Sequence, residues 1–252
     1  MYDGRIAILT LQARTLFYLG YPDQARLKKN QALSEARQLS NPYTLAMTLM
    51  GILYLEREIE SKQTVLQHAQ ELAALEFFTA PHGQYFRDWC LSELGQVQEG
   101  TALLTDALSD FRVKGLLLTV PFYLMLLAEV LEHRGHRASA LKQLDEALHL
   151  LEKTQWRWCE AELYRHKGEL LGLEGNLEAA EKFLGKALTI ARQQSAKIWE
   201  LRASTSLARL LRDQGKGVEA RDLLAPVYGW FTEGFDTFDL KEAKALLEAL
   251  AL

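Results

Sequence analysis

The sequence is poor in residues that break helices and in residues that form cross-links. Its 252 residues include only five prolines and two cysteines, Cys90 and Cys159, and neither cysteine belongs to a Cys-x-x-Cys pair. Two isolated cysteines exclude a disulfide framework and favour a reducing compartment. With few breakers among abundant alanine, leucine, glutamate, arginine and glutamine, the sequence predicts a mostly helical protein.

A long apolar run and a strong charge of one sign are also missing. The longest charge-free apolar stretch, Gly115–Ala128, is interrupted by Pro121 and is too short to span a bilayer. Asp3 and Arg14 interrupt the N-terminal segment in a way that excludes a cleaved signal peptide. The net charge of −4 argues against a dedicated nucleic-acid binder, which needs a basic stripe. We therefore expect a soluble, cytoplasmic protein with no membrane partner and no direct nucleic-acid partner.

The strongest signal that is present is a repeat at a shift of forty residues. A glycine column is followed five residues later by a column of small residues: Gly95, Gly135, Gly175 and Gly215, then Gly100, Ala140, Ala180 and Ala220. Three apolar columns keep the same register: Leu91, Leu131, Leu171 and Leu211; Leu104, Leu144, Leu184 and Leu224; Ala107, Ala147, Ala187 and Val227. Glycine with a positive φ can end one helix, and the small residue lets a second helix approach the first closely. Each unit is thus predicted to be a helical hairpin whose apolar face is covered by the next hairpin.

Two less regular units precede these four. The first contains the turn LGYPDQA, with Gly20 and Ala25 in the two columns, and the second has a charged turn at Glu56–Glu58. Prolines near the start of three first helices mark unit entries: Pro42, Pro81 and Pro121. We predict an all-α fold, a right-handed superhelical α-solenoid forming a single domain over 1–252. Its units are about six hairpins at 6–40, 42–79, 81–119, 121–159, 161–199 and 201–228, followed by a capping helix at 237–252.

The capping helix has a specific expected role. The last hairpin has no following repeat to cover its apolar residues. Five apolar residues of the terminal segment are predicted to supply that cover: Leu240, Ala243, Leu246, Leu247 and Leu250.

The fifth unit resembles the tetratricopeptide repeat. Six of its residues fall on that family's motif positions: Tyr164, Gly168, Leu171, Gly175, Ala180 and Ala187. The units depart from the family in having forty residues instead of thirty-four. The run from Ala161 onward, and most specifically the tail YGWFTEGFDT, is similar to the C-terminal region of bacterial cyclase-like and LuxR-like AAA (STAND) ATPase signalling proteins. The resemblance implies a sensor and scaffold whose catalytic parts lie elsewhere, and it leaves open whether this chain is a fragment of such a protein or stands alone.

No motif for catalysis, cofactor binding or metal binding is present. The nearest string to a phosphate-binding loop is FLGKAL around Lys186, which lies inside a predicted second helix and lacks the first glycine. His133 and His136 have a spacing that metal ligands can have, but Gly135 places them at a hairpin turn. We interpret them as a solvated turn, and we expect no enzyme activity, no cofactor and no metal.

The candidate binding residues lie on first helices, because positions 2, 5, 9 and 12 of these helices face the groove in tetratricopeptide-like hairpins. Counting along the third to sixth units gives His82, Tyr85 and Trp89; Phe122, Met125, Glu129 and Glu132; Glu162, Arg165 and Glu169; Arg202, Thr205, Arg209 and Arg212. The groove is predicted to change from aromatic, through acidic, to arginine-rich. Arg165, Arg202, Arg209 and Arg212 are suited to an acidic partner segment. Alternatively, Arg165 pairs with glutamates of its own helix and the arginines only solvate the surface.

Two hypotheses for function remain open at this point. The leading one is a non-enzymatic module that binds a peptide, helix or domain in its groove, within a bacterial signalling assembly. The alternative is an inducer-binding domain of an ATPase-type transcription regulator, which a closed aromatic pocket would favour. If the arginines are exposed, replacing Arg202 and Arg209 by glutamate should abolish partner binding and leave stability nearly unchanged. The partner's identity and the oligomeric state cannot be inferred from the sequence.

Overall fold

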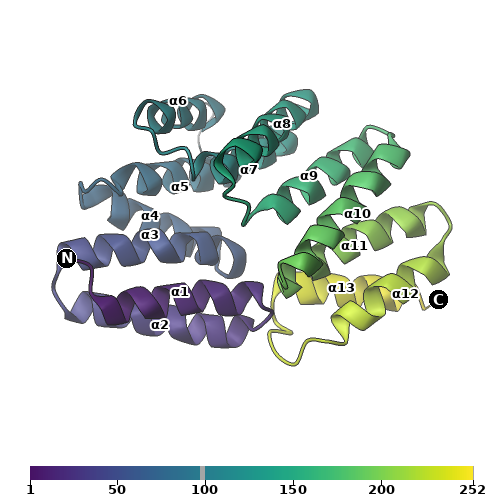
Figure 1. Ribbon diagram of the computed structural model, residues 1–252, viewed down its shortest axis with the longest axis horizontal. Helices are drawn as coiled ribbons and strands as arrows, with labels where there is room; N and C mark the ends of the chain where they lie inside the picture. Colours follow the sequence, from purple (N-terminus) through teal and green to yellow (C-terminus); the bar gives the residue numbers. More distant parts are fainter. Residues whose placement is uncertain (97–99, 252) are drawn as a thin grey trace. The chain divides into compact units, whose positions relative to one another are not determined.

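The computed structural model describes residues 1–96 and 100–251, and within them the chain forms thirteen helices and no strand (Figure 1). The fold is all-α, as predicted. The helices are α1 Gly4–Tyr18, α2 Pro22–Gln38, α3 Pro42–Ile59, α4 Lys62–Ala74, α5 Ala80–Glu93, α6 Gly100–Val113, α7 Val120–His133, α8 Arg137–Thr154, α9 Glu160–Leu173, α10 Leu177–Gln193, α11 Lys197–Asp213, α12 Gly217–Tyr228 and α13 Phe238–Ala249. None of these helices is both long enough and apolar enough to cross a membrane.

The chain divides into two units of tertiary structure. The first unit comprises residues 1–17 and 22–136, and the second comprises residues 18–21 together with the chain from residue 137 onward. Helices α1 to α7 therefore belong to the first unit, except for the last residue of α1, and α8 to α13 belong to the second.

The glycine column ends first helices by one recurring hydrogen-bond motif. Gly95, Gly135, Gly175 and Gly215 have φ of 69°, 79°, 82° and 80°, a region that favours glycine. At each of these turns the residue after the glycine donates its N–H to the carbonyl of a column leucine, at 2.8 to 2.9 Å: Leu91, Leu131, Leu171 and Leu211. This is the Schellman motif, which satisfies carbonyls that the end of a helix would leave unpaired. Two of the sequence columns are thus explained by local backbone chemistry.

The small-residue column and the second leucine column pack helix against helix. Ala140, Ala180 and Ala220 are fully buried, and so are Leu144 and Leu224. Where the column holds Gly100, an added Cβ would lie 1.8 Å from the Ser92 Oγ, so the two helices of that hairpin approach each other too closely there for a larger residue. The side chains of these columns form the contact between paired helices.

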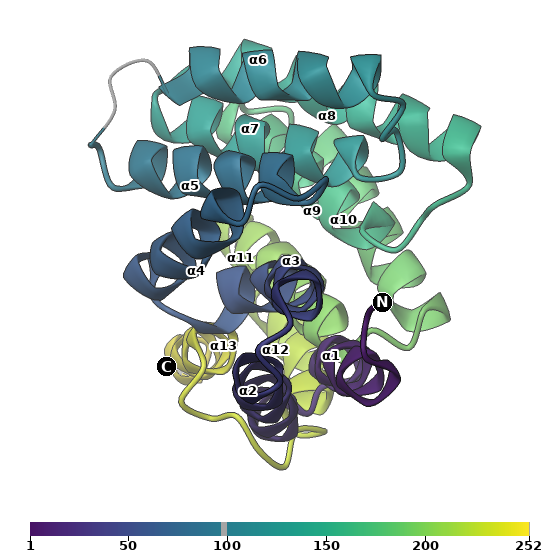
Figure 2. The same ribbon diagram turned by 90° about the vertical axis from the view of Figure 1, so that its left-hand side faces the viewer.

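First helices also contact the first helices of neighbouring hairpins. Within the first unit α3 packs on α5 and α5 on α7, and within the second unit α9 packs on α11, which also contacts the terminal helix α13. Second helices pack against this layer, as α4 does on α5 and α10 on α9 and α11. Figure 2 shows α5 and α6 running side by side in the first unit, in agreement with their contacts. This repeated layering is the arrangement expected of stacked hairpins.

The second hairpin differs from the sequence prediction. Glu56–Glu58 was expected to form a charged turn, but α3 continues through these residues and ends at Ile59. Glu56 is fully buried because Lys29 of α2 and His68 of α4 contact its carboxylate, at 3.2 and 2.8 Å. The turn lies instead at Ser61, whose Oγ accepts the N–H of Thr64 and begins α4. The charge pattern indicated a solvated turn, whereas the tertiary contacts make it a buried ion pair.

The terminal helix α13 contacts both helices of the last hairpin, α11 and α12. Leu240, Ala243 and Leu246 are buried in this contact, and Leu247 and Leu250 are partly buried. The predicted capping residues therefore face the protein.

Two tryptophans of the second unit pack near each other, and Trp199 is buried. The rings of Trp158 and Trp199 lie 6.0 Å apart, and the ring of Tyr18 lies 4.6 Å from that of Trp199. Trp156, by contrast, is half exposed. Trp199 is therefore a packing residue of the second unit, whereas Trp156 is not.

Candidate functional site

The four candidate arginines all lie in the second unit, on α9 and α11, but their environments differ. Arg165 is held by its own helix: Nε and Nη2 donate to Glu162 at 3.0 and 3.1 Å, and Nη1 donates to Glu169 at 2.7 Å. Burial alone would lower the pKa of Arg165, but the carboxylates of Glu162 and Glu169 outweigh it and raise that pKa. Both pairs have the i,i+3 and i,i+4 spacing typical of helices. For Arg165 the structure shows the alternative interpretation, pairing along one helix.

Arg202 links three helices. Its Nε and Nη2 both donate to the carboxylate of Asp239 in α13, each at 2.8 Å, while Nη1 donates to Glu162 of α9 at 3.2 Å. Only 13% of the Arg202 side chain is exposed. The expectation that Arg202 is exposed and contributes little to stability is therefore wrong, because a bidentate and largely buried pair fixes α13 against α11.

Arg209 and Arg212 are the accessible members of the set. The Arg209 guanidinium lies 2.5 Å from Glu242 of α13, in a pair about one-third exposed on both sides. Arg212 contacts only its sequence neighbour Asp213, at 2.7 Å, among the interactions described, and 43% of its side chain is exposed. Since the two residues are three apart on α11, they share one face of the helix. We call Arg209 and Arg212 the open arginines.

Asp239 and Glu242 are arginine partners that the sequence pattern did not predict. The sequence pattern predicted a role only for the apolar residues of the terminal helix, as a hydrophobic cover. The signal was available in the acidic i,i+3 pair at the start of that helix. Its consequence could not be inferred, because nothing local indicates that this face of α13 meets the arginines of α11.

The aromatic candidates lie in the first unit, and they are inside it. Tyr85 is fully buried, and its hydroxyl donates to the carbonyl of Tyr123 at 2.6 Å. Trp89 is 4% exposed. His82 is buried beside the Tyr123 hydroxyl, 2.6 Å away, and this burial lowers the pKa of His82 to about 4. The structure thus offers neither Tyr85 nor Trp89 to a partner, because the ring of Tyr123 in α7 packs on Tyr85 and the guanidinium of Arg57 in α3 lies over Trp89.

Glu129 of α7 is also engaged within the first unit. Its carboxylate pairs with the guanidinium of Arg57 in α3, and only 12% of its side chain is exposed. The same guanidinium lies 5.7 Å from the ring centroid of Trp89 and 5.6 Å from that of Phe122. Glu129 therefore neutralises a cation that stacks between two aromatic rings.

The histidine pair at the fourth hairpin turn has an ordinary structural environment. His133 Nδ1 lies 2.9 Å from the carboxylate of Glu93, which also accepts a hydrogen bond from Lys62. Burial alone would raise the pKa of Glu93, but these hydrogen bonds bring it below its usual range. Over residues 1–96 and 100–251, no group of three or more His, Cys, Asp or Glu side chains is arranged to hold a metal ion.

Several solved structures have a similar arrangement of helices. The peptide-bound NprR structure, a complex with the peptide NprX, aligns over 100% of this chain and 73% of its own, with a TM-score of 0.64 and 15% identity. A STAND protein with a tetratricopeptide repeat sensor, from Pyrococcus horikoshii, aligns over 98% of this chain and 37% of its own, with a TM-score of 0.53 and 15% identity. Tetratricopeptide-like repeats of a kinesin light chain from Podospora anserina align over 75% of this chain and 94% of theirs, with a TM-score of 0.53 and 17% identity. The fold is that of a tetratricopeptide-like repeat array. No family model and no curated protein sequence matches the chain.

Proposed function

We propose that this repeat array is a non-enzymatic interaction module that binds a protein or peptide, and that the open arginines of α11 contact an acidic segment of the partner. The proposal rests on a difference in environment among the four candidate arginines. Arg165 and Arg202 are 13% exposed and donate to carboxylates of α9 and α13, whereas Arg209 and Arg212, in exposed ion pairs, lie one turn apart. Two such groups on one helix face suit a carboxylate-rich helix or peptide.

The structural neighbours support a partner of this class. The NprR structure is a complex with its cognate peptide, and the Pyrococcus protein is described as having a tetratricopeptide repeat sensor in a signal transduction ATPase. We further propose, from the sequence resemblance to bacterial STAND ATPase signalling proteins, that the module belongs to a signalling assembly of a bacterium, in the cytoplasm. The two cysteines, which are free and buried, support the cytoplasmic assignment.

Affinity capture with matched variants tests the proposal. Extracts of the source cell are passed over the wild-type chain, the double variant Arg209→Glu/Arg212→Glu, and a control that reverses two other exposed cations, Arg221→Glu/Lys241→Glu. Partners should be retained by the wild type and the control and lost from the double variant. Their retention should also fall as salt rises, because exposed charges are screened beyond about 8 Å at physiological ionic strength. If a folded double variant retains the same proteins as the control, the open arginines are not the binding site.

A further inference from the structure

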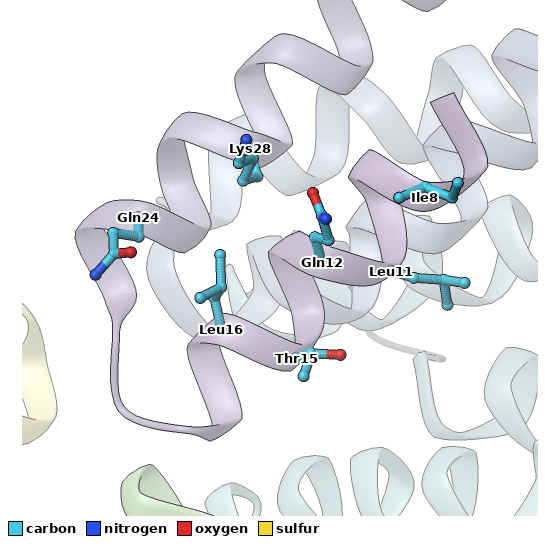
Figure 3. A pocket seen from close by; sticks show the side chains of 7 residues that line it. All are labelled: Ile8, Leu11, Gln12, Thr15, Leu16, Gln24 and Lys28. Atoms are coloured by element: carbon cyan, nitrogen blue, oxygen red, sulfur yellow. The ribbon is translucent and has the colours of Figure 1, made fainter. Parts of the chain in front are cut away.

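The first hairpin carries an apolar groove on a face that no described helix covers. The groove lies between α1 and α2, has a volume of about 490 Å³ and is lined by Ile8, Leu11, Gln12, Thr15, Leu16, Gln24 and Lys28. Figure 3 shows Gln12 and Leu16 of α1 pointing toward α2, which carries Gln24 and Lys28. Ile8 and Leu11 are 58% and 60% exposed. Two large aliphatic side chains that are this exposed, and that lie beside an apolar groove, indicate a docking surface.

The equivalent face of the fifth hairpin shows what covers such a surface. Gly20 and Gly175 both end first helices with positive φ, of 96° and 82°, so the two hairpins can be aligned on these glycines. Counted from them, Ile8 corresponds to Leu163, which is fully buried. In the fifth hairpin, helix α8 packs on α9 and contacts Lys167, which corresponds to Gln12 of the groove. The first hairpin has the apolar face and lacks the covering helix in the described structure.

Helix α8 makes two kinds of contact with the face that it covers. Its Leu148 packs against the apolar cluster around Tyr164. Its Asp145, one turn earlier, accepts a hydrogen bond from Lys167 Nζ at 2.5 Å. The Lys167 ammonium also lies 4.4 Å from the ring centroid of Phe183 in α10, which places this cation at the seam between the two helices of the hairpin.

The first hairpin has a cation at the same seam. Gln12 and Lys28 occupy the positions of Lys167 and Phe183, so the lysine is moved from the first helix to the second. Over the described residues, Lys28 makes no ion pair, and its side chain is only partly exposed. An apolar groove next to a lysine that has no carboxylate partner is complementary to a helix that carries both a leucine and an acid.

We propose that the α1–α2 groove binds an acidic amphipathic helix of a partner protein, in the way that α9 receives α8. The bound helix carries a leucine that enters the groove beside Ile8 and Leu11. It carries an aspartate or glutamate one turn before the leucine, which pairs with Lys28. This site belongs to the stacking face of the first hairpin, so it is separate from the open arginines of α11 and goes beyond the function proposed for them.

Helix α8 itself supplies the probe. A fluorescent peptide of residues 137–154, held helical by a lactam between Lys142 and Glu146, is titrated against the full chain and followed by fluorescence anisotropy. We expect saturable binding that Leu11→Arg weakens by at least about tenfold, since burial of one leucine side chain contributes that much. A control at another exposed aliphatic residue, Val218→Arg, should bind as the wild type does. The Arg209→Glu/Arg212→Glu variant should also bind normally, which separates this site from the one in α11.

Charge exchange tests the predicted ion pair. A peptide with Asp145→Lys should bind the wild-type chain more weakly and should regain affinity for the Lys28→Glu chain. Absence of binding to the wild type, equal binding to the folded Leu11→Arg chain, or no recovery on charge exchange would each overturn the proposal. Sedimentation of the chain alone tests whether a second copy of the chain occupies the groove instead. A dimer that Leu11→Arg abolishes would mean that a second copy covers this face, and the proposal of a partner helix would be wrong.

Discussion

The pairing of Arg202 with Asp239 predicts that one arginine of α11 is a structural residue while its neighbour on the same helix is not. The Arg202 side chain is 13% exposed and Asp239 is 11% exposed, and the two are joined by two hydrogen bonds of 2.8 Å. Removing one member of a buried pair costs about 3–5 kcal/mol, because the other charge is left without compensation. Glu162 would still be bound by Arg165, so we expect Arg202→Ala to lower the free energy of unfolding by about 2 kcal/mol.

Arg209 provides the matched comparison. Its pair with Glu242 is about one-third exposed on both sides, and exposed ion pairs contribute about 0–1 kcal/mol. We therefore expect Arg209→Ala to change the free energy of unfolding by less than about 1 kcal/mol. Arg202→Met separates charge from packing, since methionine retains much of the aliphatic stem of arginine and none of its hydrogen bonds.

Urea unfolding followed by tryptophan fluorescence is a suitable measurement. Four of the five tryptophans lie in the second unit, at 156, 158, 199 and 230, so the signal reports mainly on the part of the chain that contains these pairs. Double-mutant cycles with Asp239→Ala and Glu242→Ala should give a coupling energy above about 1 kcal/mol for Arg202 and below about 0.5 kcal/mol for Arg209. Equal couplings, or a loss below 1 kcal/mol for Arg202→Ala, would refute the assignment of different roles to the two arginines.

Three further predictions concern the fold. Because burial lowers the pKa of His82 from 6.5 to about 4, neutral His82 contributes stability that is fully present above pH 6.5 and is lost as pH falls from 6.5 toward 4. The free energy of unfolding of the wild type should therefore fall by up to about 3 kcal/mol over this pH range. The fall should be absent in His82→Phe and present in the exposed control His136→Phe. Ala180→Trp should cost about 1–3 kcal/mol in urea unfolding, since Ala180 is fully buried between paired helices; an unchanged transition would show that the column is not a packing contact. Deleting residues 236–252 should uncover Leu224 and cause aggregation or dimerisation in sedimentation, whereas a truncated chain that stays monomeric and equally stable would show that α13 is not a cap.

The parts of the fold that the sequence predicted well depend on local chemistry. A glycine that ends a helix through the Schellman motif needs only its own positive φ and the carbonyls of the preceding turn. The helix end at Gly175 and Leu171 could therefore be predicted without knowledge of tertiary contacts. The fully buried Ala180, five residues later, follows from the same turn, because the chain has just reversed against the first helix. Periodicity in such columns therefore predicted helices, turns and the paired contact.

The parts that failed depend on contacts between helices far apart in the chain. Glu56 has the sequence context of a solvated turn, and only the approach of Lys29 and His68 from α2 and α4 makes it a buried carboxylate. Tyr85 occupies a position that faces a groove in tetratricopeptide-like hairpins, yet here Tyr123 of α7 packs over it, 4.3 Å between ring centroids. Counting positions along one helix cannot anticipate a large aromatic side chain on a neighbouring one.

The same contrast supports the proposal that the open arginines contact a partner. Residues that build the array recur at a shift of forty, whereas the ninth position of successive first helices holds Glu129, Glu169 and then Arg209. A position that changes the sign of its charge between units cannot be required by the repeated packing, which is the same in each unit. Glu129 and Glu169 are nevertheless paired with Arg57 and Arg165, so their charges stabilise the chain itself. Arg209, in its exposed pair with Glu242, is the member of this position to which we assign partner binding in the proposed function.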